Sequence, residues 1–227
     1  MSAYGFVKIE RDVKKAIPNP NKPTPQTGTQ LPRTQVSDFT LNYATEKLPA
    51  KVLNHSIRVY LYSQAIIKDQ FPQWKLSPEL VFVTSLLHDI GTTNENMHAT
   101  KMSFEFYGGL LSRELILAKT QNQDYADAVS EAIIRHQDLG ETGYITTLGL
   151  ILQIATILDN VGLNSHLIHE DTLDAVNKAY TRDGWLNCFA DAIGNENRLK
   201  PWGHTSALGV DDFPNDVLKN KLKYEKL

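Results

Sequence analysis

The sequence predicts an all-α protein, and three observations support that fold class. Apolar residues recur every three or four positions through most of residues 52–193. One such stretch begins at Ser77-Pro78 and stops at Gly91, which are residues typical of helix starts and ends. No run alternates apolar and polar residues between turn signals, as a half-exposed strand would. We therefore expect a helical fold.

The expected helices follow from apolar stripes at helical spacing. They cover residues 52–71, 77–90, 100–117, 124–136, 145–161, 171–181 and 185–193. Three of the stripes include a polar residue: His55 with Val59, Tyr62 and Ile66; His136 with Ala126, Val129 and Ile133; and Asp159 with Leu148, Leu152 and Ala155. A polar residue that continues an apolar stripe points toward the interior. His55, His136 and Asp159 are therefore candidates for chemistry.

The flanks of the helical core differ from it in composition. Residues 18–32 contain five of the ten prolines, and we read residues 1–34 as an extended, proline-rich N-terminal arm. Such an arm either crosses the surface or wraps a partner subunit, and a disordered leader is an equal alternative. Residues 35–210 form the expected core. Residues 211–227, rich in Asp, Asn and Lys, are expected to be a solvated tail or a terminal helix.

Composition excludes several classes of protein. The chain has 227 residues, with 23 Lys and Arg against 26 Asp and Glu, so its net charge of −3 argues against a general nucleic-acid binder. A single cysteine, Cys188, excludes an intrachain disulfide framework and fits a reducing compartment. The start lacks the pattern of a signal peptide, and no run of 18 apolar residues occurs. We therefore expect a cytoplasmic protein without membrane spans; a homo-oligomer stays open.

Four polar residues on three apolar surfaces suggest a metal site. His88-Asp89 ends one apolar helix, Asp159 ends another, and His55 begins a third. Taken singly, each has an ordinary explanation: a helix cap, a helix-end hydrogen bond, or an Asp–Arg pair. Taken together, two imidazoles and two carboxylates suit one divalent cation, with Zn²⁺, Fe²⁺ and Mn²⁺ as the fitting metals. The cation would offset the charge of the buried carboxylates.

The same residues resemble the HD-domain superfamily, whose metal site combines a His, an adjacent His-Asp pair and a distal Asp. The resemblance covers about residues 50–165 and implies a helical bundle with His55, His88, Asp89 and Asp159 as ligands. Five longer segments are also similar to the fungal cyanamide hydratases: residues 52–56, 86–90, 100–109, 133–138 and 201–206. That closer resemblance implies a zinc enzyme that adds water to the nitrile of cyanamide to give urea.

Two other functions are weighed against hydration. Most HD-domain enzymes cleave phosphate esters, and many of them carry a Lys directly after the Gly position or two residues after it, because a scissile phosphate needs cations beside it. Here Gly91 is followed by Thr92-Thr93, and the next basic residue is Lys101. This departure makes a metal-dependent phosphohydrolase acting on nucleotides the alternative rather than the first hypothesis. The third hypothesis is a catalytically silent module that binds a small ligand or a partner protein.

Three residues are candidates for catalysis. Asp89 has a carboxylate that can bind metal through one oxygen and accept a proton through the other. Thr156 lies three residues before Asp159, on the same side of its helix, and could orient the substrate or relay a proton. Its hydroxyl could instead bond the carbonyl one turn back. His136 could bind the substrate or act as acid or base, or it could support a ligand carboxylate. The ordinary alternative is a core histidine whose hydrogen bonds are satisfied.

The remaining polar residues receive less specific expectations. Gln137 and Asn160 are candidates to support the ligands. Lys101 and Glu105 are four residues apart, so we expect an exposed ion pair. Gly108-Gly109 within a helix suggests close backbone approach to another element. The other four histidines, His98, His166, His169 and His204, are expected to be mostly ordinary surface or loop residues.

Overall fold

The computed structural model describes residues 4–220, 222 and 224–225, and it confirms the all-α fold. The helices are α1 Val13–Ala16, α2 Gln35–Lys47, α3 Ala50–Gln70, α4 Pro78–Leu87, α5 Asn94–Ala99, α6 Phe104–Thr120, α7 Gln123–Ile134, α8 Thr147–Val161, α9 Glu170–Ala179, α10 Trp185–Leu199 and α11 Asp212–Leu218. Short 3-10 helices, η1 Ile90–Thr92, η2 Ser165–Leu167 and η3 His204–Leu208, lie between them. No helix in the described part of the chain has the length and apolar character needed to cross a membrane.

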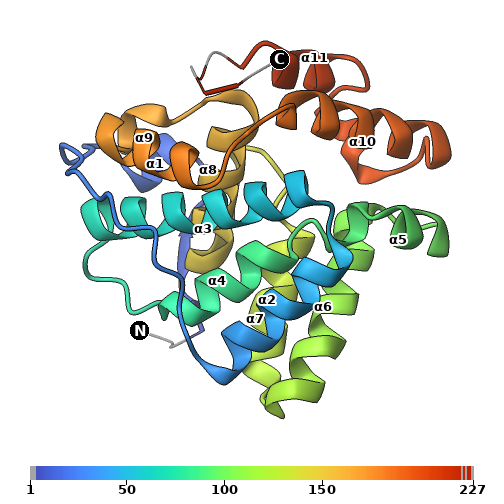
Figure 1. Cartoon of the computed structure of the whole chain (residues 1–227), viewed down its shortest axis with the longest axis horizontal. Coiled ribbons are helices and arrows are strands. Elements are labelled where there is room, and N and C mark those ends of the chain that lie inside the picture. The colour runs from blue at the N-terminus through green and yellow to red at the C-terminus, as the bar shows by residue number, and fades with distance from the viewer. Residues whose placement is uncertain (1–3, 221, 223, 226–227) are drawn as a thin grey trace.

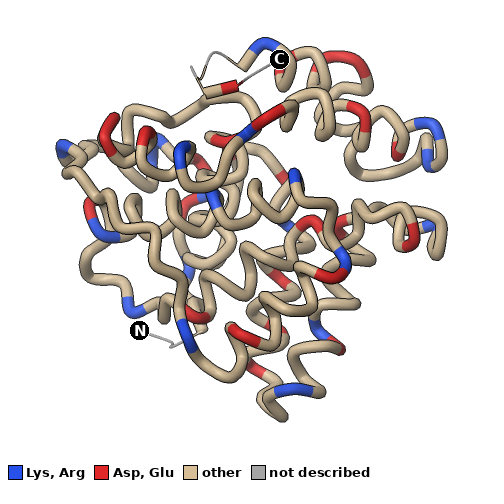
Figure 2. The backbone as a smooth tube through the Cα atoms, viewed as in Figure 1, with Lys and Arg blue, Asp and Glu red and all other residues tan. Residues whose placement is uncertain are grey.

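Helix α3 runs through the centre of the molecule and contacts both α4 and α8 (Figure 1). Helices α6 and α7 form a hairpin on one side of this centre, while α10 and α11 pack together near the C-terminal end. The metal-site residues expected on α3, α4 and α8 are therefore carried by helices that contact one another. Lys and Arg are interspersed with Asp and Glu over most of the described backbone, but residues 142–158, which include most of α8, carry no charged side chain (Figure 2).

The buried faces follow the expected stripes. His55, Val59, Tyr62 and Ile66 on α3 have no exposed surface. The stripes of α7 and α8 are buried as well, including Asp159 at 0% exposure, and His136, in the turn just after α7, is 4% exposed. At roughly 25 cal/mol per Å² of buried apolar surface, these faces supply the main stabilisation of the bundle.

Helix α4 begins as expected but ends earlier. Ser77 accepts a hydrogen bond from the Leu80 amide, and Pro78 occupies the first turn. The helix stops at Leu87 instead of Ile90, and Asp89 leaves helical geometry with φ −100° and ψ 12° before η1 begins. This early end turns Asp89 out of the helix ladder beside His88.

A backbone contact between η1 and α6 confirms the close approach expected at Gly108-Gly109. A Cβ at Gly91 would lie 2.1 Å from the Phe104 carbonyl oxygen, and one at Gly108 would lie 3.2 Å from the Gly91 nitrogen. At Gly109, a Cβ would lie 2.5 Å from Ile134 Cγ1 of α7. Glycine is required at position 91, because no side chain fits between its backbone and that of Phe104.

Helix α2, a small sheet and the short helices α1 and α5 were absent from the sequence prediction. Helix α2 buries only Ser37, Thr40 and Ala44, so it has no strong apolar stripe. A two-stranded antiparallel sheet pairs β1 (Lys8–Glu10) with β2 (Tyr144–Thr146), with Ile9 opposite Ile145. Each strand is three residues long, too short for alternation to be recognisable.

The segment between α1 and α2 contains no helix or strand, and polar contacts connect it to the core. The backbone N–H of Asn21 donates to Gln70 Oε1 at 2.8 Å, and the Thr24 hydroxyl donates to Asp69 Oδ1 at 2.7 Å. The backbone N–H of Gln26 donates to Thr172 Oγ1 at 2.8 Å. The boundary of an N-terminal arm at residue 34 stays a prediction.

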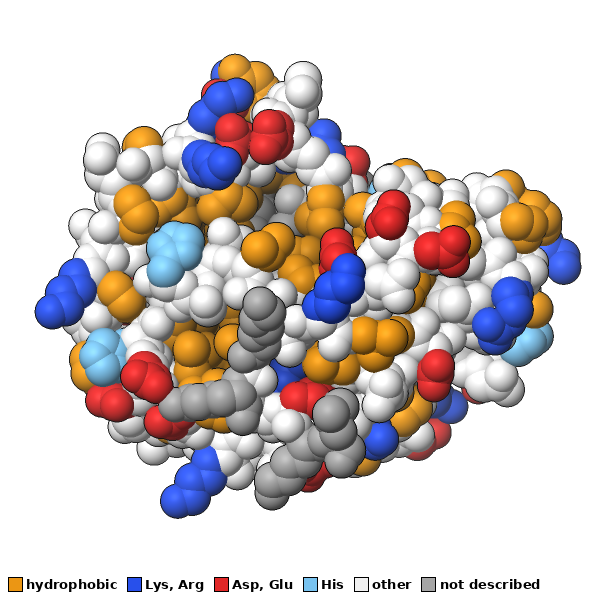
Figure 3. Space-filling view, turned by 90° about the horizontal axis from the view of Figure 1, so that it is seen from above, with side chains coloured by type: hydrophobic (Ala, Val, Ile, Leu, Met, Phe, Trp, Pro, Cys, Tyr) orange, Lys and Arg blue, Asp and Glu red, His pale blue; other side chains and the backbone are white. Residues whose placement is uncertain are grey.

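The C-terminal segment packs against the bundle. Helix α11 buries Phe213 and Val217, and residues of this segment line an apolar hollow of about 590 Å³ beside α8. Figure 3 shows apolar side chains gathered around hollows on this face. Ile157 and Val161 of α8 line the hollow together with Phe213 and Leu222. The segment after residue 211 therefore forms part of the packed structure as far as it is described.

Candidate metal centre

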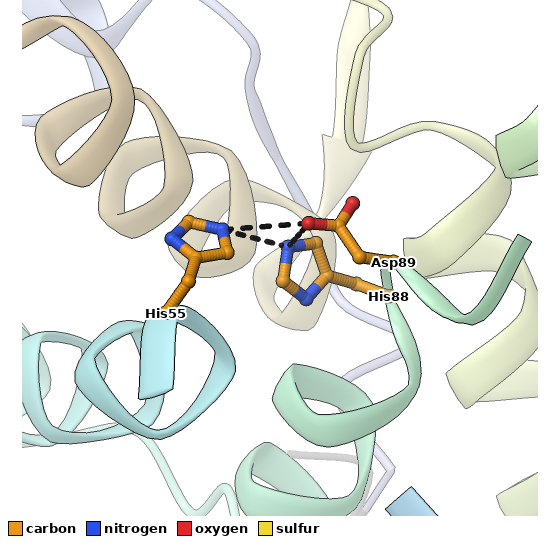
Figure 4. Close-up of side chains that lie close together, drawn as sticks. All are labelled: His55, His88 and Asp89. Atoms are coloured by element: carbon orange, nitrogen blue, oxygen red, sulfur yellow. Dashed lines mark hydrogen bonds and ion pairs between the residues drawn. The ribbon is translucent and has the colours of Figure 1, made fainter. Parts of the chain in front are cut away.

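Three buried side chains converge where α3 meets the end of α4 (Figure 4). The Nε2 atoms of His55 and His88 are 3.1 Å apart, and Oδ2 of Asp89 lies 3.2 Å from His88 Nε2 and 3.6 Å from His55 Nε2. The atoms of these three residues that could bind a metal lie within 4.8 Å of one another, which is close enough to hold one metal ion. The structure thus brings together three of the four expected ligands.

The hydrogen bonds of the His55 and His88 rings determine which nitrogen of each ring is free to bind a metal. His88 Nδ1 lies 2.7 Å from the Ser85 carbonyl oxygen, and His55 Nδ1 lies 2.6 Å from Asp159 Oδ2. Because both partners are acceptors, each Nδ1 carries the hydrogen, and in the neutral rings each Nε2 presents a lone pair. The two lone pairs face each other and the Asp89 carboxylate. A proton or a metal cation must lie among these three groups, and one divalent cation would satisfy all of them.

Burial makes the unpaired carboxylate expensive. Asp89 is 1% exposed, and neither of its oxygens has a hydrogen-bond donor among the described residues. Burial alone would raise the pKa of Asp89, but the His88 and His55 imidazoles hold that pKa below its usual range. The carboxylate is therefore ionised at neutral pH, which is the form that binds a metal.

The two ligand imidazoles differ in protonation. Burial lowers the pKa of His55 to about 4 in spite of the neighbouring Asp159, so its ring is neutral at pH 7. Burial also opposes the charged form of His88, yet Asp89 beside it raises the His88 pKa. A divalent cation at this position would take the place of the proton that the His88–Asp89 pair attracts.

His136 lies at the edge of the same cluster. Its Nε2 atom is 3.8 Å from Asp89 Oδ1, and its ring stands edge-on to His88 with a centroid distance of 5.2 Å. Its Nδ1 lies 2.7 Å from the Ile133 carbonyl oxygen, so this third Nε2 also carries a free lone pair when the ring is neutral. Burial lowers the His136 pKa to about 4. The structure thus places a neutral imidazole beside the free Asp89 oxygen.

Asp159 lies behind His55 and outside the three-residue cluster. Its Oδ2 atom bonds His55 Nδ1, on the side of the ring opposite the cluster, and it also accepts from Arg58 Nη2 at 2.8 Å. Its Oδ1 atom accepts from Arg182 Nη1 at 2.6 Å and from Arg58 Nε at 3.0 Å. Two guanidinium groups therefore occupy the carboxylate that was expected to bind metal. Burial would raise the Asp159 pKa, but Arg182 and Arg58 hold it well below its usual value.

The polar side chains of Thr156, Gln137 and Asn160 each bond to another group of the protein. The Thr156 hydroxyl donates to carbonyls of its own helix, at 2.9 Å from Leu152 O or 3.1 Å from Gln153 O. Its hydrogen is therefore used within α8, while its lone pairs can still accept. Gln137 Oε1 accepts from the Thr205 hydroxyl at 3.1 Å, and Asn160 Oδ1 accepts from the Trp185 ring nitrogen at 3.2 Å. These contacts leave the catalytic role of Thr156 a prediction.

Comparison with known proteins identifies the family. The HD domain family matches residues 52–161, the range that holds His55, His88, Asp89 and Asp159. The chain is also 60% identical over 225 residues to cyanamide hydratase DDI2 and to cyanamide hydratase DDI3, both of Saccharomyces cerevisiae. Each match covers 99% of this chain and 100% of the relative. The chain belongs to the cyanamide hydratase family. In this family member the HD domain provides α3, α4 and α8, the helices on which the cluster depends.

One expectation about this cyanamide hydratase family member was wrong. Glu105 does not form an exposed ion pair with Lys101; it is fully buried, and its Oε1 lies 2.7 Å from His204 Nδ1. Helix α6 begins at Phe104, so Glu105 lies in its first turn and turns inward beneath η3. His204, expected to be an ordinary loop residue, is the partner of this carboxylate.

Sequence reasoning also missed residues that hold the cluster in this family member. Arg58, Arg182 and Trp185 are buried around His55 and Asp159, and the Trp185 ring stacks on His55 at a centroid distance of 4.1 Å. Arg58 had a detectable signal, because it lies three residues after His55 on the inward face of α3. Arg182 and Trp185 had none, because they follow α9 and reach the site only through the tertiary fold.

Proposed function

We propose that this chain hydrates cyanamide to urea, using a divalent metal held by His55, His88 and Asp89. The observation that carries the proposal is the buried cluster in which the Nε2 atoms of His55 and His88 and the Asp89 carboxylate lie within 4.8 Å of one another. The relatives named cyanamide hydratase match the chain over essentially its whole length, which supports the choice of substrate.

The donor set supports zinc as the metal. Two imidazole nitrogens and one carboxylate oxygen are ligands that Zn²⁺ accepts readily, with Fe²⁺ and Mn²⁺ as alternatives. A bound divalent cation supplies Lewis acidity and lowers the pKa of a bound water from about 15.7 to about 7. Asp159 is then best placed to fix the orientation and tautomer of His55 through Nδ1, as outer carboxylates do at many metal sites. Its role as a fourth ligand stays a prediction from the sequence.

The protein's own groups would manage the protons of the reaction. Hydration forms a C–O bond at the nitrile carbon, places one proton of water on the nitrile nitrogen, and yields an isourea that tautomerises to urea. Asp89 Oδ1 and His136 Nε2 lie 3.8 Å apart. Each can accept a proton from the attacking water or a hydrogen bond from an N–H group of the substrate. Thr156 can accept an N–H of the amino group through its lone pairs.

The surroundings of the cluster favour a small neutral substrate over a phosphate ester. The guanidinium groups of Arg58 and Arg182 are bound to Asp159, and Arg135 is bound to Asp138 at 3.2 Å. Lys101 is exposed. These four basic side chains are thus directed elsewhere, whereas a phosphoryl group requires cations within reach. The three cluster residues are at most 1% exposed, which suits a linear three-heavy-atom nitrile better than a nucleotide.

Metal analysis followed by parallel assays tests the proposal. Purified protein is expected to contain close to one zinc per chain, to release urea from cyanamide, and to release no phosphate from a panel of nucleotides at the same metal loading. Asp89→Asn keeps the side-chain shape and removes its charge, so it should lose both metal and urea release. Phosphate release without urea formation would overturn the hydratase proposal in favour of the phosphohydrolase. The cytoplasmic location stays a prediction.

A further inference from the structure

A carboxylate near the C-terminal end of the chain reaches the surroundings of the metal cluster. The Glu225 side chain is only 7% exposed, and its Oε2 atom lies 3.1 Å from Nε of the fully buried Arg182. Its other oxygen, Oε1, accepts from the Leu186 backbone amide at 3.3 Å. A glutamate in a solvated tail would make neither contact, so both contacts require an explanation.

The first contact leads to His55 through charged side chains. Arg182 donates from Nη1 to Asp159 Oδ1 at 2.6 Å and from Nη2 to the Asp159 carbonyl oxygen at 2.9 Å. Asp159 in turn bonds His55 Nδ1 through its Oδ2 atom at 2.6 Å. Glu225 thus completes a row of alternating charges, and Arg182, with side-chain partners of its own on both sides, is held in one orientation.

The second contact leads to His55 through an aromatic ring. Helix α10 begins at Trp185, and the residue before it, Gly184, has no side chain with which to cap the helix. Glu225 supplies the missing acceptor to an amide of the first turn, where a negative charge is also favourable. The Trp185 ring lies almost parallel to His55, at an interplanar angle of 13°. Capping this turn therefore holds the ring that covers one face of the ligand imidazole.

We propose that Glu225 is a positioning residue of the metal centre. It holds Arg182 and Asp159 on the Nδ1 side of His55, which faces away from the metal, and it holds Trp185 against one face of the His55 ring. This proposal rests on the metal site proposed above. The charged row fixes the direction of the His55 Nε2 lone pair, and the stacked ring fixes the plane of the imidazole. The segment that follows α11 is then part of the active-site architecture, although it lies outside the HD domain match at residues 52–161.

The test compares zinc affinity across tail variants by competition with a chromogenic chelator. Glu225→Ala should weaken zinc binding on the order of 10-fold, the lower end of the range for outer partners of metal ligands. Glu225→Gln keeps an oxygen for the Leu186 amide but loses the charge facing Arg182, so its loss should be smaller. Asp216→Asn is the matched charge control, because Asp216 is in the same segment with a 62% exposed side chain; its affinity should equal that of wild type.

A stability control separates positioning from folding. Val217→Ala removes two methyl groups from a buried position of α11. No hydrogen bond or ion pair among the described residues joins Val217 to Glu225. It should lower the unfolding temperature of the metal-free protein without changing zinc affinity. A second readout is the ring ¹⁵N chemical shifts of His55 in metal-free protein, which should move in Glu225→Ala and remain in place in Asp216→Asn.

Each outcome decides one claim. Unchanged zinc affinity and unchanged His55 shifts in Glu225→Ala would overturn the role of Glu225. An equal loss of affinity in Val217→Ala would show that Glu225 serves only general stability. A wild-type protein that binds no zinc would contradict the proposed metal centre itself, and the His55 shifts in the metal-free protein would still test the positioning role.

Discussion

His55 and Asp159 are joined on the far side of the imidazole ring from the cluster: Nδ1 lies 2.6 Å from Oδ2, while Nε2 faces His88 at 3.1 Å. The ring thus has one nitrogen committed to a carboxylate and one free for a metal. Because Arg58 and Arg182 also bind this carboxylate, Asp159 has little freedom to turn toward the cluster. Asp159, Arg58 and Arg182 thus hold the His55 ring in one orientation, with its Nε2 lone pair directed at the cluster.

Replacing Asp159 by Asn tests this arrangement. The amide keeps an oxygen for His55 but no longer compensates two buried guanidinium groups, so zinc affinity should fall by about 10- to 100-fold. X-ray absorption at the zinc edge should show the same number of ligands in the variant as in wild type. Loss of one oxygen ligand from the spectrum would instead establish Asp159 as a direct ligand, as the HD-domain resemblance implies.

Thr156 provides a test of catalysis separate from metal binding. Thr156→Val removes the hydroxyl while preserving shape, so metal content and unfolding temperature should stay close to wild type. If the hydroxyl oxygen accepts from the substrate, kcat should fall by roughly 10²-fold or more, while Thr156→Ser, which retains the hydroxyl, should keep most of the activity. Near-normal turnover in Thr156→Val would mean that the hydroxyl serves only the carbonyls of Leu152 and Gln153, and His136 would become the better candidate for proton transfer.

The contact between η1 and α6 predicts that Gly91 cannot be replaced without loss of stability, whereas Gly194 in the open part of α10 is a control with the opposite expected effect. Gly91→Ala should destabilise the protein by about 1–3 kcal/mol or more, because its Cβ would lie 2.1 Å from the Phe104 carbonyl oxygen and must push α6 away. Gly194→Ala should stabilise the protein by about 0.5–1 kcal/mol, since its Cβ would meet only Arg198 at 3.6 Å within α10. Chemical denaturation measures both. Equal stabilities of the two variants would contradict the contact.

A buried carboxylate joins α10 to the start of α6. Glu196 accepts from the Phe104 amide at 2.6 Å and from the Thr205 hydroxyl at 2.6 Å, and it lies 3.8 Å from the buried Lys200 ammonium. Glu196→Ala should therefore cost about 3–5 kcal/mol, because it leaves a buried cation and an amide without a partner. For a chain of this size each kcal/mol corresponds to about 2–4 °C in Tm. Calorimetry should show that Glu196→Ala with Lys200→Met loses less than Glu196→Ala alone.

The sequence predicted what depends on periodicity. The stripes on α3, α7 and α8 are buried as expected, since the inward position of His55, His136 and Asp159 follows from helical spacing alone. Helix α2 escaped prediction because a face built from Ser37, Thr40 and Ala44 has little apolar contrast. Short elements such as β1 and β2 depend on a partner more than 130 positions away, which local patterns cannot indicate.

The residues around the ligands were harder to predict for a related reason. Glu105 looked like a partner for Lys101 because both lie four positions apart, yet its partner is His204 from η3. Nothing local showed that Arg182 would reach Asp159 across 23 positions. Spacing identifies which polar residues turn inward, but the choice among metal, guanidinium and imidazole as their partner is made by the tertiary structure.

The depth of the cluster has a consequence for how the site would be loaded. His55, His88 and Asp89 are each at most 1% exposed, so a chelator cannot reach them while the surrounding helices remain closed. Exchange of a bound ion would then proceed through transient opening of the protein. The rate of removal should reach a plateau as chelator concentration rises, and that plateau would measure how often the helices around the site separate.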